Sequence, residues 1–413
     1  MHRRLVVLVL CEWLAGCGPH PRSAQVSATR SEAVRPGIDV LLADSTAIVR
    51  DRRVGLVTNQ AGVDAQGISD VARLQAAGVR LVALFSPEHG FRGAAEPGAA
   101  VASSVDSATG LPIYSLYGRS TAPTDTMLAG IDLLLVDLQD AGARYYTYLF
   151  TTVEVMRAAA GRGIPVVVLD RPDPIGGVVQ GNVLDPAYRT PVGQLAVPMR
   201  YGMTLAELAR LARADLGLAT DLRVVPVAGW QRAAALDDTG LPFIPPSPNL
   251  RSLEALYHYP GTCLFEGTNL SVGRGTSAAF MQVGAPWLDT TAVLARVRGA
   301  HLPGVRFHGV TFTPRAPGDG KYADTLVHGI RLELTDRKRY DPTATAVYLL
   351  AAVRAASGHH FGWIPKHFDR LAGGPTLRES LEAGTEPATI VAGWAADIQR
   401  FLERRRPFLL YPE

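Results

Sequence analysis

Short, continuously apolar runs alternate with segments of helical periodicity between about residues 37 and 260. The apolar runs, which we expect to be strands, cover residues 54–59, 81–85, 133–138 and 166–169. Between them, residues 70–77 and 147–160 carry apolar side chains at helical spacing, and a glycine follows each segment. Strands that are apolar along their whole length are buried on both faces, which is typical of a parallel sheet between two layers of helices. With right-handed crossovers, this pattern predicts an α/β fold built on a doubly wound parallel sheet.

A different pattern begins near Glu266. The expected elements there are helices at 291–297 and 343–356 and strands at 305–312 and 330–334. With so few elements in succession, this region is predicted to form a smaller α+β domain. The roughly 380 residues from 37 to 413 also exceed the size of one typical core. We therefore expect domain limits at 37–263 and 264–413.

The N-terminus has the features of a targeting signal. Two arginines precede a short apolar run, and residues 14–17 read Leu-Ala-Gly-Cys, which resembles the lipobox of bacterial lipoproteins. The apolar run is too short to span a bilayer as a helix. We expect residues 1–16 to be a signal peptide, Cys17 to carry lipid, and residues 17–36 to form a polar tether. The alternative is a chance cysteine in an ordinary secretory signal.

This signal predicts an exported protein that is anchored in a membrane by lipid and faces the periplasm or the cell wall. With Cys11 removed and Cys17 acylated, only Cys263 remains, so no internal disulfide can form and the fold must depend on its core. Removal of residues 1–16 takes away two arginines and a glutamate and lowers the formal net charge from +3 to +2. So small a charge argues against a nucleic-acid partner, which requires a concentrated basic surface.

Polar residues gather directly after three of the expected strands, in the loops at 86–93, 139–146 and 170–177. Ligands of open α/β sheets bind beyond the carboxyl ends of the strands. These loops carry the candidate side chains Glu88, His89, Arg92, Asp140, Arg144, Tyr145, Asp170 and Asp173. A carboxylate-rich site is therefore expected at this edge of the sheet.

Most of these side chains have both a functional and a structural interpretation. A carboxyl at Glu88 in a partly apolar pocket would suit a general acid, or it could cap a helix or pair with Arg92. Arg144 could hold a substrate carboxylate in a bidentate contact, or it could pair with Asp140 and fix the loop. The tyrosines that follow could stack against a sugar ring. Asp170 could contact a ligand or serve as a turn residue, because the Asp-Pro and Gly-Gly pairs nearby mark turns.

A second candidate segment lies at the expected domain junction, at residues 265–276. It contains Glu266, Asn269 and Arg274 among several glycines, and ligand clefts are common at domain junctions. The glycines on either side of Arg274 do not open a dinucleotide loop, because no clean strand precedes them and the third glycine is missing. The sequence indicates neither a cofactor nor a metal ion, and it leaves hydrolysis by carboxylates open.

Several longer strings of residues stand out. They are Val-Thr-Asn-Gln at 57–60, Ser-Pro-Glu-His-Gly-Phe-Arg-Gly at 86–93, Asp-Leu-Gln-Asp-Ala-Gly-Ala-Arg-Tyr-Tyr-Thr-Tyr at 137–148, Asp-Arg-Pro-Asp-Pro-Ile-Gly-Gly at 170–177, Pro-Ser-Pro-Asn at 246–249, and the segments 264–269 and 273–276. In this order, they resemble the NamZ-type exo-β-N-acetylmuramidases, and the similarity runs from about residue 37 to near the C-terminus. Ala278 and Ala279 depart from the family pattern and affect the expected shape of the sugar pocket.

The resemblance implies a Rossmann-like N-terminal domain and a smaller C-terminal domain, with the active site between them. It implies hydrolysis of β-1,4-linked N-acetylmuramic acid from the non-reducing ends of peptidoglycan fragments. Glu88 matches the position of the family's catalytic carboxylate, and Asp140 and Glu266 are the candidates for its partner. The expected substrate contacts are His89, Arg92, Arg144, Tyr145, Asp170, Asn269 and Arg274.

N-acetylmuramic acid carries a lactyl carboxylate, so an arginine is expected in the site. Arg144 and Arg274 are the candidates, and the glycines that flank Arg274 favour it. Two rival interpretations remain. One is a lipid-anchored protein that binds muramyl sugars without cleaving them, and the other is a metal-dependent hydrolase that uses His89, Asp140 and Asp170.

Overall fold

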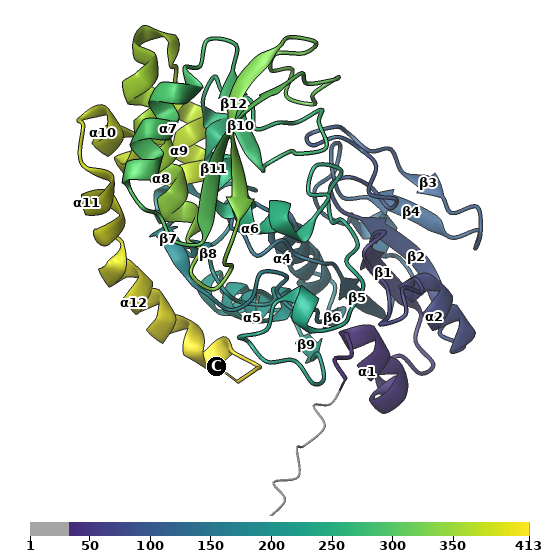
Figure 1. The fold of residues 1–413 in the computed structure, drawn as a ribbon. Helices are drawn as coiled ribbons and strands as arrows, with labels where there is room; N and C mark the ends of the chain where they lie inside the picture. Colours follow the sequence, from purple (N-terminus) through teal and green to yellow (C-terminus); the bar gives the residue numbers. More distant parts are fainter. Residues whose placement is uncertain (1–32, 413) are drawn as a thin grey trace, which may run out of the picture. The chain divides into compact units, whose positions relative to one another are not determined.

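Within residues 33–412, which the structure describes, the largest sheet has seven strands in the order β3-β4-β2-β1-β5-β6-β9 (Figure 1). The strands are β1 (Val54–Thr58), β2 (Leu81–Ser86), β3 (Ser104–Val105), β4 (Pro112–Ser115), β5 (Leu133–Asp137), β6 (Val166–Leu169) and β9 (Leu222–Val225). All run parallel except β3, which pairs antiparallel with β4 at one edge. Counted along the chain, the parallel strands lie in the order third, second, first, fourth, fifth, sixth, which is that of the Rossmann fold. The computed structural model thus confirms the expected Rossmann-like sheet.

Helices cover both faces of this sheet. They are α1 (Gly37–Asp44) and α2 (Asp70–Ala76) on one face, and α4 (Tyr148–Ala160) and α5 (Leu205–Asp215) on the other. Successive side chains of a strand point to opposite faces. In β5, Leu133 and Leu135 therefore join the core with α1 and α2, while Leu134 and Val136 join the core with α4 and α5. Burial of each such side chain contributes about 1.5–3 kcal/mol, which explains why the strand is apolar along its length.

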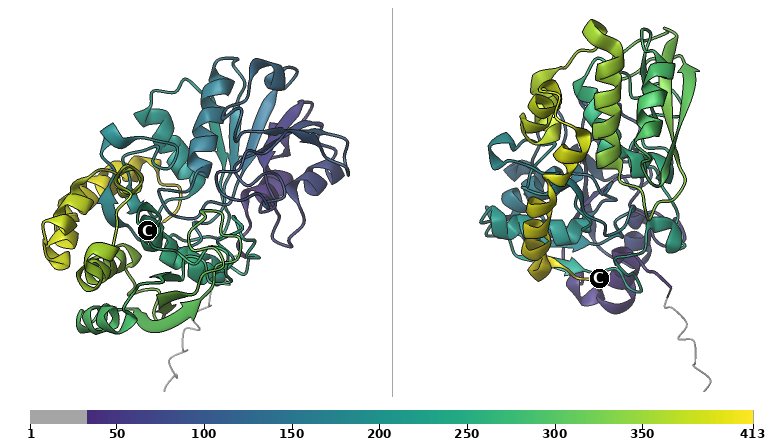
Figure 2. Two further views of the ribbon diagram at one scale, coloured as in Figure 1. Left: turned by 90° about the horizontal axis from the view of Figure 1, so that it is seen from above. Right: turned by 60° about the vertical axis from the view of Figure 1, so that its left-hand side comes forward.

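The C-terminal half contains a three-stranded antiparallel sheet in the order β10-β12-β11, and helices that run beside it (Figure 2). The strands are β10 (Gln282–Ala285), β11 (Val305–Phe312) and β12 (Val327–Leu334). The helices are α6 (Leu253–Thr262), α7 (Thr290–Gly299), α8 (Pro342–Ser357), α9 (Pro365–Ala372), α10 (Thr376–Glu382), α11 (Pro387–Ala392) and α12 (Ala395–Arg405). This region confirms the expected smaller α+β part of the fold.

The two halves share one hydrophobic cluster, which contains Val136 of β5 together with Leu349 of α8. Helix α6 packs against α8. A two-stranded antiparallel ribbon of β7 (Gln180–Val183) and β8 (Pro198–Arg200) contacts α6, α8 and α12. Because the core is continuous, the limits 37–263 and 264–413 stay predictions.

The C-terminal segment after α12 returns to the Rossmann-like sheet, where Figure 1 shows its end close to β9. The Tyr411 hydroxyl donates to Asp170 Oδ2 at 2.5 Å, and the Leu410 backbone N–H donates to Glu207 Oε1 at 2.7 Å. The Tyr411 ring also meets Trp230 edge to face, with centroids 4.8 Å apart. Side chains of the C-terminal segment thereby occupy the space beyond the carboxyl end of β6.

The expected signal peptide (1–16), Cys17 and most of the tether (17–36) lie outside the described residues. In the part of the chain from 33 to 412, no helix combines the length and the apolar character needed to cross a membrane. Export and lipidation accordingly stay predictions.

Candidate active site

A cleft of about 740 Å³ opens where the loops beyond β2 and β5 meet segments of the C-terminal half. The N-terminal half contributes Glu88, Tyr117, Tyr145 and Thr147 to its lining, among others. The polar side chains that the C-terminal half contributes include Glu266, Arg274, Lys321, His367 and Arg370. A concave site with apolar walls and a few convergent polar groups is the usual form of a small-molecule site.

Glu88 is held by one hydrogen bond on each carboxylate oxygen. The Gly98 backbone N–H donates to Oε1 at 2.9 Å, and the Thr147 hydroxyl donates to Oε2 at 2.6 Å. Thr147 directly precedes α4, so the loop after β5 fixes a side chain that follows β2. Burial, and then the nearby Glu88 carboxylate, raises the pKa of Tyr117 to about 12. Tyr117 therefore stays a neutral hydroxyl beside Glu88 at physiological pH.

His89 shapes the turn that presents Glu88 and does not itself line the cleft. Its backbone has φ 71°, in the left-handed region, which costs a residue other than glycine about 1–3 kcal/mol. The His89 side chain is buried, and its Nδ1 lies 2.8 Å from the Ala95 carbonyl oxygen. Backbone strain of this kind persists where the surroundings over-determine it, and it is common at functional sites.

Glu266 is another carboxylate of the cleft, whose lining also includes Asp319. It lies in the short 3-10 segment Cys263–Gly267, and the Arg274 Nε donates to its Oε1 at 2.6 Å. Burial alone would raise the pKa of Glu266, but the charge and hydrogen bond of Arg274, with nearby Lys321, outweigh burial and lower the pKa. Arg274 also lies over the Phe280 ring, 4.9 Å from its centroid. Glu266 is therefore held as an anion.

Lys321 fixes the backbone that carries Glu266. Its Nζ donates to the carbonyl oxygens of Glu266, Thr268 and Leu270 at 3.0, 2.7 and 3.0 Å, and it lies 3.5 Å from that of Phe265. Burial lowers the pKa of Lys321, although neighbouring Asp319 and Glu266 partly offset this. The ammonium thus binds several carbonyl oxygens of the segment 265–270, and we refer to this contact as the carbonyl cage.

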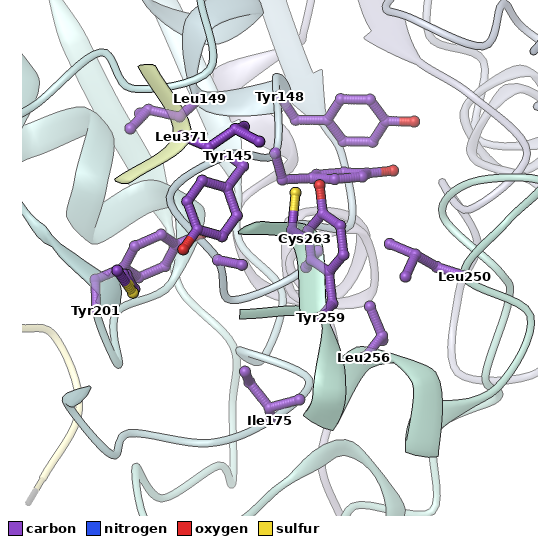
Figure 3. Close-up of a cluster of buried hydrophobic side chains, with 14 of the residues drawn as sticks. Tyr145, Tyr148, Leu149, Ile175, Tyr201, Leu250, Leu256, Tyr259, Cys263 and Leu371 are labelled. Atoms are coloured by element: carbon purple, nitrogen blue, oxygen red, sulfur yellow. The ribbon is translucent and has the colours of Figure 1, made fainter. Parts of the chain in front are cut away.

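Aromatic and apolar side chains form one wall of the cleft. Tyr145, Tyr259, Cys263 and Leu371 line it, and Figure 3 shows them within one buried cluster. The Tyr145 hydroxyl donates to the Pro260 carbonyl at 2.9 Å, so this ring is fixed in place. Burial raises the pKa of Cys263, which keeps the thiol inert and agrees with the expected role of a small buried hydrophobe. Rings of this kind can pack against the apolar face of a sugar.

Asp140 does not reach the cleft. Its Oδ2 accepts hydrogen bonds from the Gly142 backbone N–H at 2.9 Å and from the Tyr201 hydroxyl. Burial raises the pKa of Asp140 to about 6. A carboxyl enclosed in this way cannot contact a ligand in the cleft, whose lining carboxylates are Glu88, Glu266 and Asp319.

Arg144 is likewise structural. Its Nη1 donates to the carbonyl oxygens of Asn182 and Val197 at 2.8 and 3.0 Å, and its Nη2 donates to that of Leu371 at 2.9 Å. It is buried, it does not line the cleft, and these bonds tie the loop after β5 to β7 and α9. The expectation that Arg144 clamps a substrate, or pairs with Asp140, is therefore replaced by a role in joining the two halves.

Three further candidates also lie apart from the cleft. Arg92 is largely exposed and lies 3.9 Å from Asp106. Asn269 binds the chain around residues 360–362, with Nδ2 2.8 Å from the His360 carbonyl and Oδ1 3.0 Å from the Gly362 N–H. Asp170 accepts from Tyr411, Thr204 and the Ala206 N–H. None of the three faces the proposed ligand space.

The three residues of the metal-site interpretation, His89, Asp140 and Asp170, are occupied by separate partners. Among residues 33–412, no group of three or more His, Cys, Asp or Glu side chains has an arrangement that could hold a metal ion.

Several cleft residues were not expected from the sequence. Lys321 lies in a loop without periodicity, and Tyr117 follows β4, a strand too short to stand out. His367 and Arg370 are three residues apart on α9, which places them on one helix face. That spacing, after the helix-starting Pro365, was the one signal that could have indicated them.

The chain matches known proteins along almost its whole length. The N-terminal family model of the exo-β-N-acetylmuramidase NamZ matches residues 54–254, and the C-terminal model matches residues 257–411. The peptidoglycan β-N-acetylmuramidase NamZ of Bacillus subtilis (strain 168) is 39% identical over 410 residues, which are 98% of each chain.

Solved structures give the same result. Crystal structures of two DUF1343 family proteins from Bacteroides fragilis NCTC 9343 are each 32% identical to this chain. They cover 92% of it, and 99% and 100% of their own chains, with TM-scores of 0.84 and 0.77. From the two family models and this identity, the chain belongs to the NamZ exo-β-N-acetylmuramidase family.

Proposed function

We propose that the protein is an exo-acting glycosidase that releases N-acetylmuramic acid from the non-reducing end of β-1,4-linked peptidoglycan fragments. The observation that carries this proposal is the pair of carboxyl groups, Glu88 and Glu266, in one cleft with aromatic walls. Most glycosidases cleave their bond with two carboxyl groups, through a transition state that resembles an oxocarbenium ion. Family membership supplies the class of substrate.

The two carboxyl groups have different surroundings, and we assign different roles to them. Glu266 is paired with Arg274 and kept anionic, which suits stabilisation of developing positive charge on the sugar ring. Glu88 has no ion pair with any residue in 33–412, and the groups around its carboxylate are the Gly98 N–H and the Thr147 and Tyr117 hydroxyls. Glu88 is thus the group that exchanges a proton with the glycosidic oxygen or with water.

The test is hydrolysis of a chromogenic muramyl-glucosaminide by the purified protein and by Glu88→Gln. We expect turnover by the wild type and a loss of about two to four orders of magnitude in the variant. Glu96→Gln is a matched control, because Glu96 lies in the same loop and does not line the cleft. Near-normal turnover by Glu88→Gln, with unchanged sugar affinity, would instead favour the binding-protein interpretation.

We also propose that the mature protein is a lipoprotein, anchored through Cys17 and exported towards the cell wall. The support is the Leu-Ala-Gly-Cys string at 14–17 and the polar segment that follows it. Fractionation of cells that express Cys17→Ser tests the anchor, because the variant should leave the membrane fraction. Retention of the variant in that fraction would contradict lipidation.

A further inference from the structure

Three permanent cations line the cleft, and two of them are already committed to partners in the chain. Arg274 is neutralised by Glu266, with a distance of 2.6 Å between Nε and Oε1. Lys321 Nζ donates its hydrogen bonds to the carbonyl oxygens of the carbonyl cage. The charge of Arg274 is already compensated by Glu266, although its Nη1 has no hydrogen-bond partner, and Lys321 would have to give up carbonyl contacts to receive an anion.

Arg370 is the third cation, and its situation differs. Its Nη2 lies 2.8 Å from His367 Nδ1, and no ion pair within residues 33–412 involves it. The adjacent carboxylate, Asp369, is occupied by Arg378 at 2.8 and 2.9 Å. Arg370 is half-buried at the cleft wall, where a charge without a counter-ion is unfavourable. An anionic ligand would supply the missing partner.

His367 orients this guanidinium. Because a guanidinium can only donate, His367 Nδ1 must be the acceptor, and the ring is therefore neutral. Burial, and then the charge of Arg370, lowers the pKa of His367, which agrees with a neutral ring. The ring holds one edge of the guanidinium, Nε is buried without a hydrogen-bond partner, and the N–H groups left on Nη1 and Nη2 can form a bidentate contact.

Arg370 and Glu88 line the same cleft, from its C-terminal and N-terminal halves respectively, and Tyr117 lines it as well. The pKa of Tyr117 is raised by Glu88 and lowered by Arg370, so both charges act on the same part of the cleft. A sugar whose glycosidic oxygen meets Glu88 can thus place a ring substituent towards Arg370.

We propose that Arg370, positioned by His367, binds the lactyl carboxylate of the terminal sugar and so selects N-acetylmuramic acid over N-acetylglucosamine. This inference rests on the proposed function, and it replaces Arg144 and Arg274 as the expected contacts of that carboxylate. It also implies a preference for a free carboxylate, because an amide-linked peptide stem removes the charge.

The experiment compares the chromogenic β-glycosides of N-acetylmuramic acid, its lactyl methylamide and N-acetylglucosamine. In Arg370→Gln, kcat/KM for the muramide should fall about tenfold or more, as expected for loss of a charge-assisted contact. The values for the other two glycosides should change little. Arg370→Lys should recover only part of the loss, because the bidentate geometry is absent.

Lys366→Gln is the control, because it removes a positive charge from the same helix at an exposed position outside the cleft. Melting temperatures establish that each variant is folded. The proposal is overturned if Arg370→Gln lowers kcat/KM equally for all three glycosides, or if the free muramide keeps its full advantage. Arg370 could instead bind a carboxylate of the peptide stem. Substrates that carry a stem would then be cleaved faster than the free muramide, and Arg370→Gln would abolish that advantage. This result too would contradict the lactyl assignment.

A failure of the proposed function gives a different result. In that case the wild type hydrolyses none of the three glycosides, whatever residue occupies position 370. Calorimetric titration with free N-acetylmuramic acid and free N-acetylglucosamine then tests Arg370 independently of turnover. The wild type should bind the former more tightly, and Arg370→Gln should bind both alike. Equal binding of both sugars by the wild type would overturn the assignment.

Discussion

Buried charged side chains occur in two regions of the molecule. One region is at the carboxyl ends of β1 and β5, and the other is the cleft. The charges are paired within the chain in the first region and border an open space in the second. At the strand ends, Arg171 binds Asp137 through Nε and Nη2, and Nη2 lies 3.0 Å from Asp137 Oδ2. The same Nη2 lies 3.7 Å from Asp70 Oδ1. These strands flank the point where the strand order reverses, the usual ligand position of a Rossmann fold. Here the chain fills that position itself.

In the cleft, by contrast, the charged groups border a space large enough for a sugar. Burial raises the pKa of Asp70 and of Asp137 despite Arg171, whereas Arg274 lowers that of Glu266. A carboxylate at a strand end is therefore functional only where the chain leaves room beside it. The closed network of Arg171, Asp137 and Asp70 contributes to stability, and the charged groups that border the cleft are accessible to a substrate.

The largest effect is expected from opening the closed network. Arg171→Met leaves Asp137 and Asp70 buried without a cation, which should lower the free energy of unfolding by about 3–5 kcal/mol. Denaturant unfolding measures the loss, and kcat per folded molecule should remain near that of the wild type. Arg171→Met combined with Asp137→Leu should recover part of the stability, since no charge is then stranded. A folded Arg171→Met with greatly reduced kcat would mean that the network takes part in catalysis.

Glu266→Gln should have the next largest effect, on turnover alone. The amide keeps the shape but removes the negative charge that faces the sugar, so kcat should fall by about two to three orders of magnitude. Steady-state kinetics on the muramyl-glucosaminide measure this, with Glu96→Gln as the control. An unchanged kcat would show that Glu88 works without a second carboxylate, for example with the substrate's N-acetyl group as nucleophile.

Lys321→Met should have a moderate effect, because Lys321 is a positioning residue that acts through the Glu266 loop. Loss of the carbonyl cage should reduce kcat roughly ten- to hundredfold. Ammonium ions can occupy the vacated cage, so ammonium chloride should restore part of the activity and tetramethylammonium chloride should not. The exposed Lys338→Met serves as the control and should match the wild type. Equal responses to the two salts would contradict the cage as the cause.

The smallest effect, taken per pH unit, concerns the pH dependence of stability. Burial, and then the charge of Asp140, raises the pKa of Asp173 to about 8, above an unfolded value of about 3.9. The native state then binds more protons, so this group makes stability fall as pH rises from about 4 to about 8, by at most about 1.4 kcal/mol per pH unit. Asp173→Asn, which mimics the protonated form, should flatten that slope in denaturant titrations. An identical slope in the variant would show that Asp173 is ionised in the native state.

The N-terminal sheet was largely predictable from the sequence, because a strand buried on both faces must be apolar throughout. The runs that become β1, β2, β5 and β6 all met this condition. The strands β4 and β9 were missed, since their burial is partial and their runs are short. Helices α9 to α12 were also missed, although α9 and α12 are amphipathic and Pro365 marks the start of α9.

The site was predictable only in part. Glu88, Tyr145, Glu266 and Arg274 reach the cleft, while the other candidates from the same strings do not. Sequence places a residue at a strand end, but it cannot say which neighbour will satisfy its polar atoms. The partners of Asp170 and Arg144 come from Tyr411 and Leu371, more than 200 residues away. Contacts of that range depend on tertiary packing and leave no local pattern.

The most direct test of this account compares two carboxyl groups that follow strands of the same sheet, Glu88 after β2 and Asp140 after β5. Glu88→Gln and Asp140→Asn each remove one charge, and kcat on the muramyl-glucosaminide is measured for the folded fraction of each. We expect Glu88→Gln to lose about two to four orders of magnitude in kcat. Asp140→Asn should keep a kcat close to that of the wild type, with any loss confined to stability. A folded Asp140→Asn that is inactive, beside a Glu88→Gln that turns over normally, would contradict the assignment of the cleft as the active site.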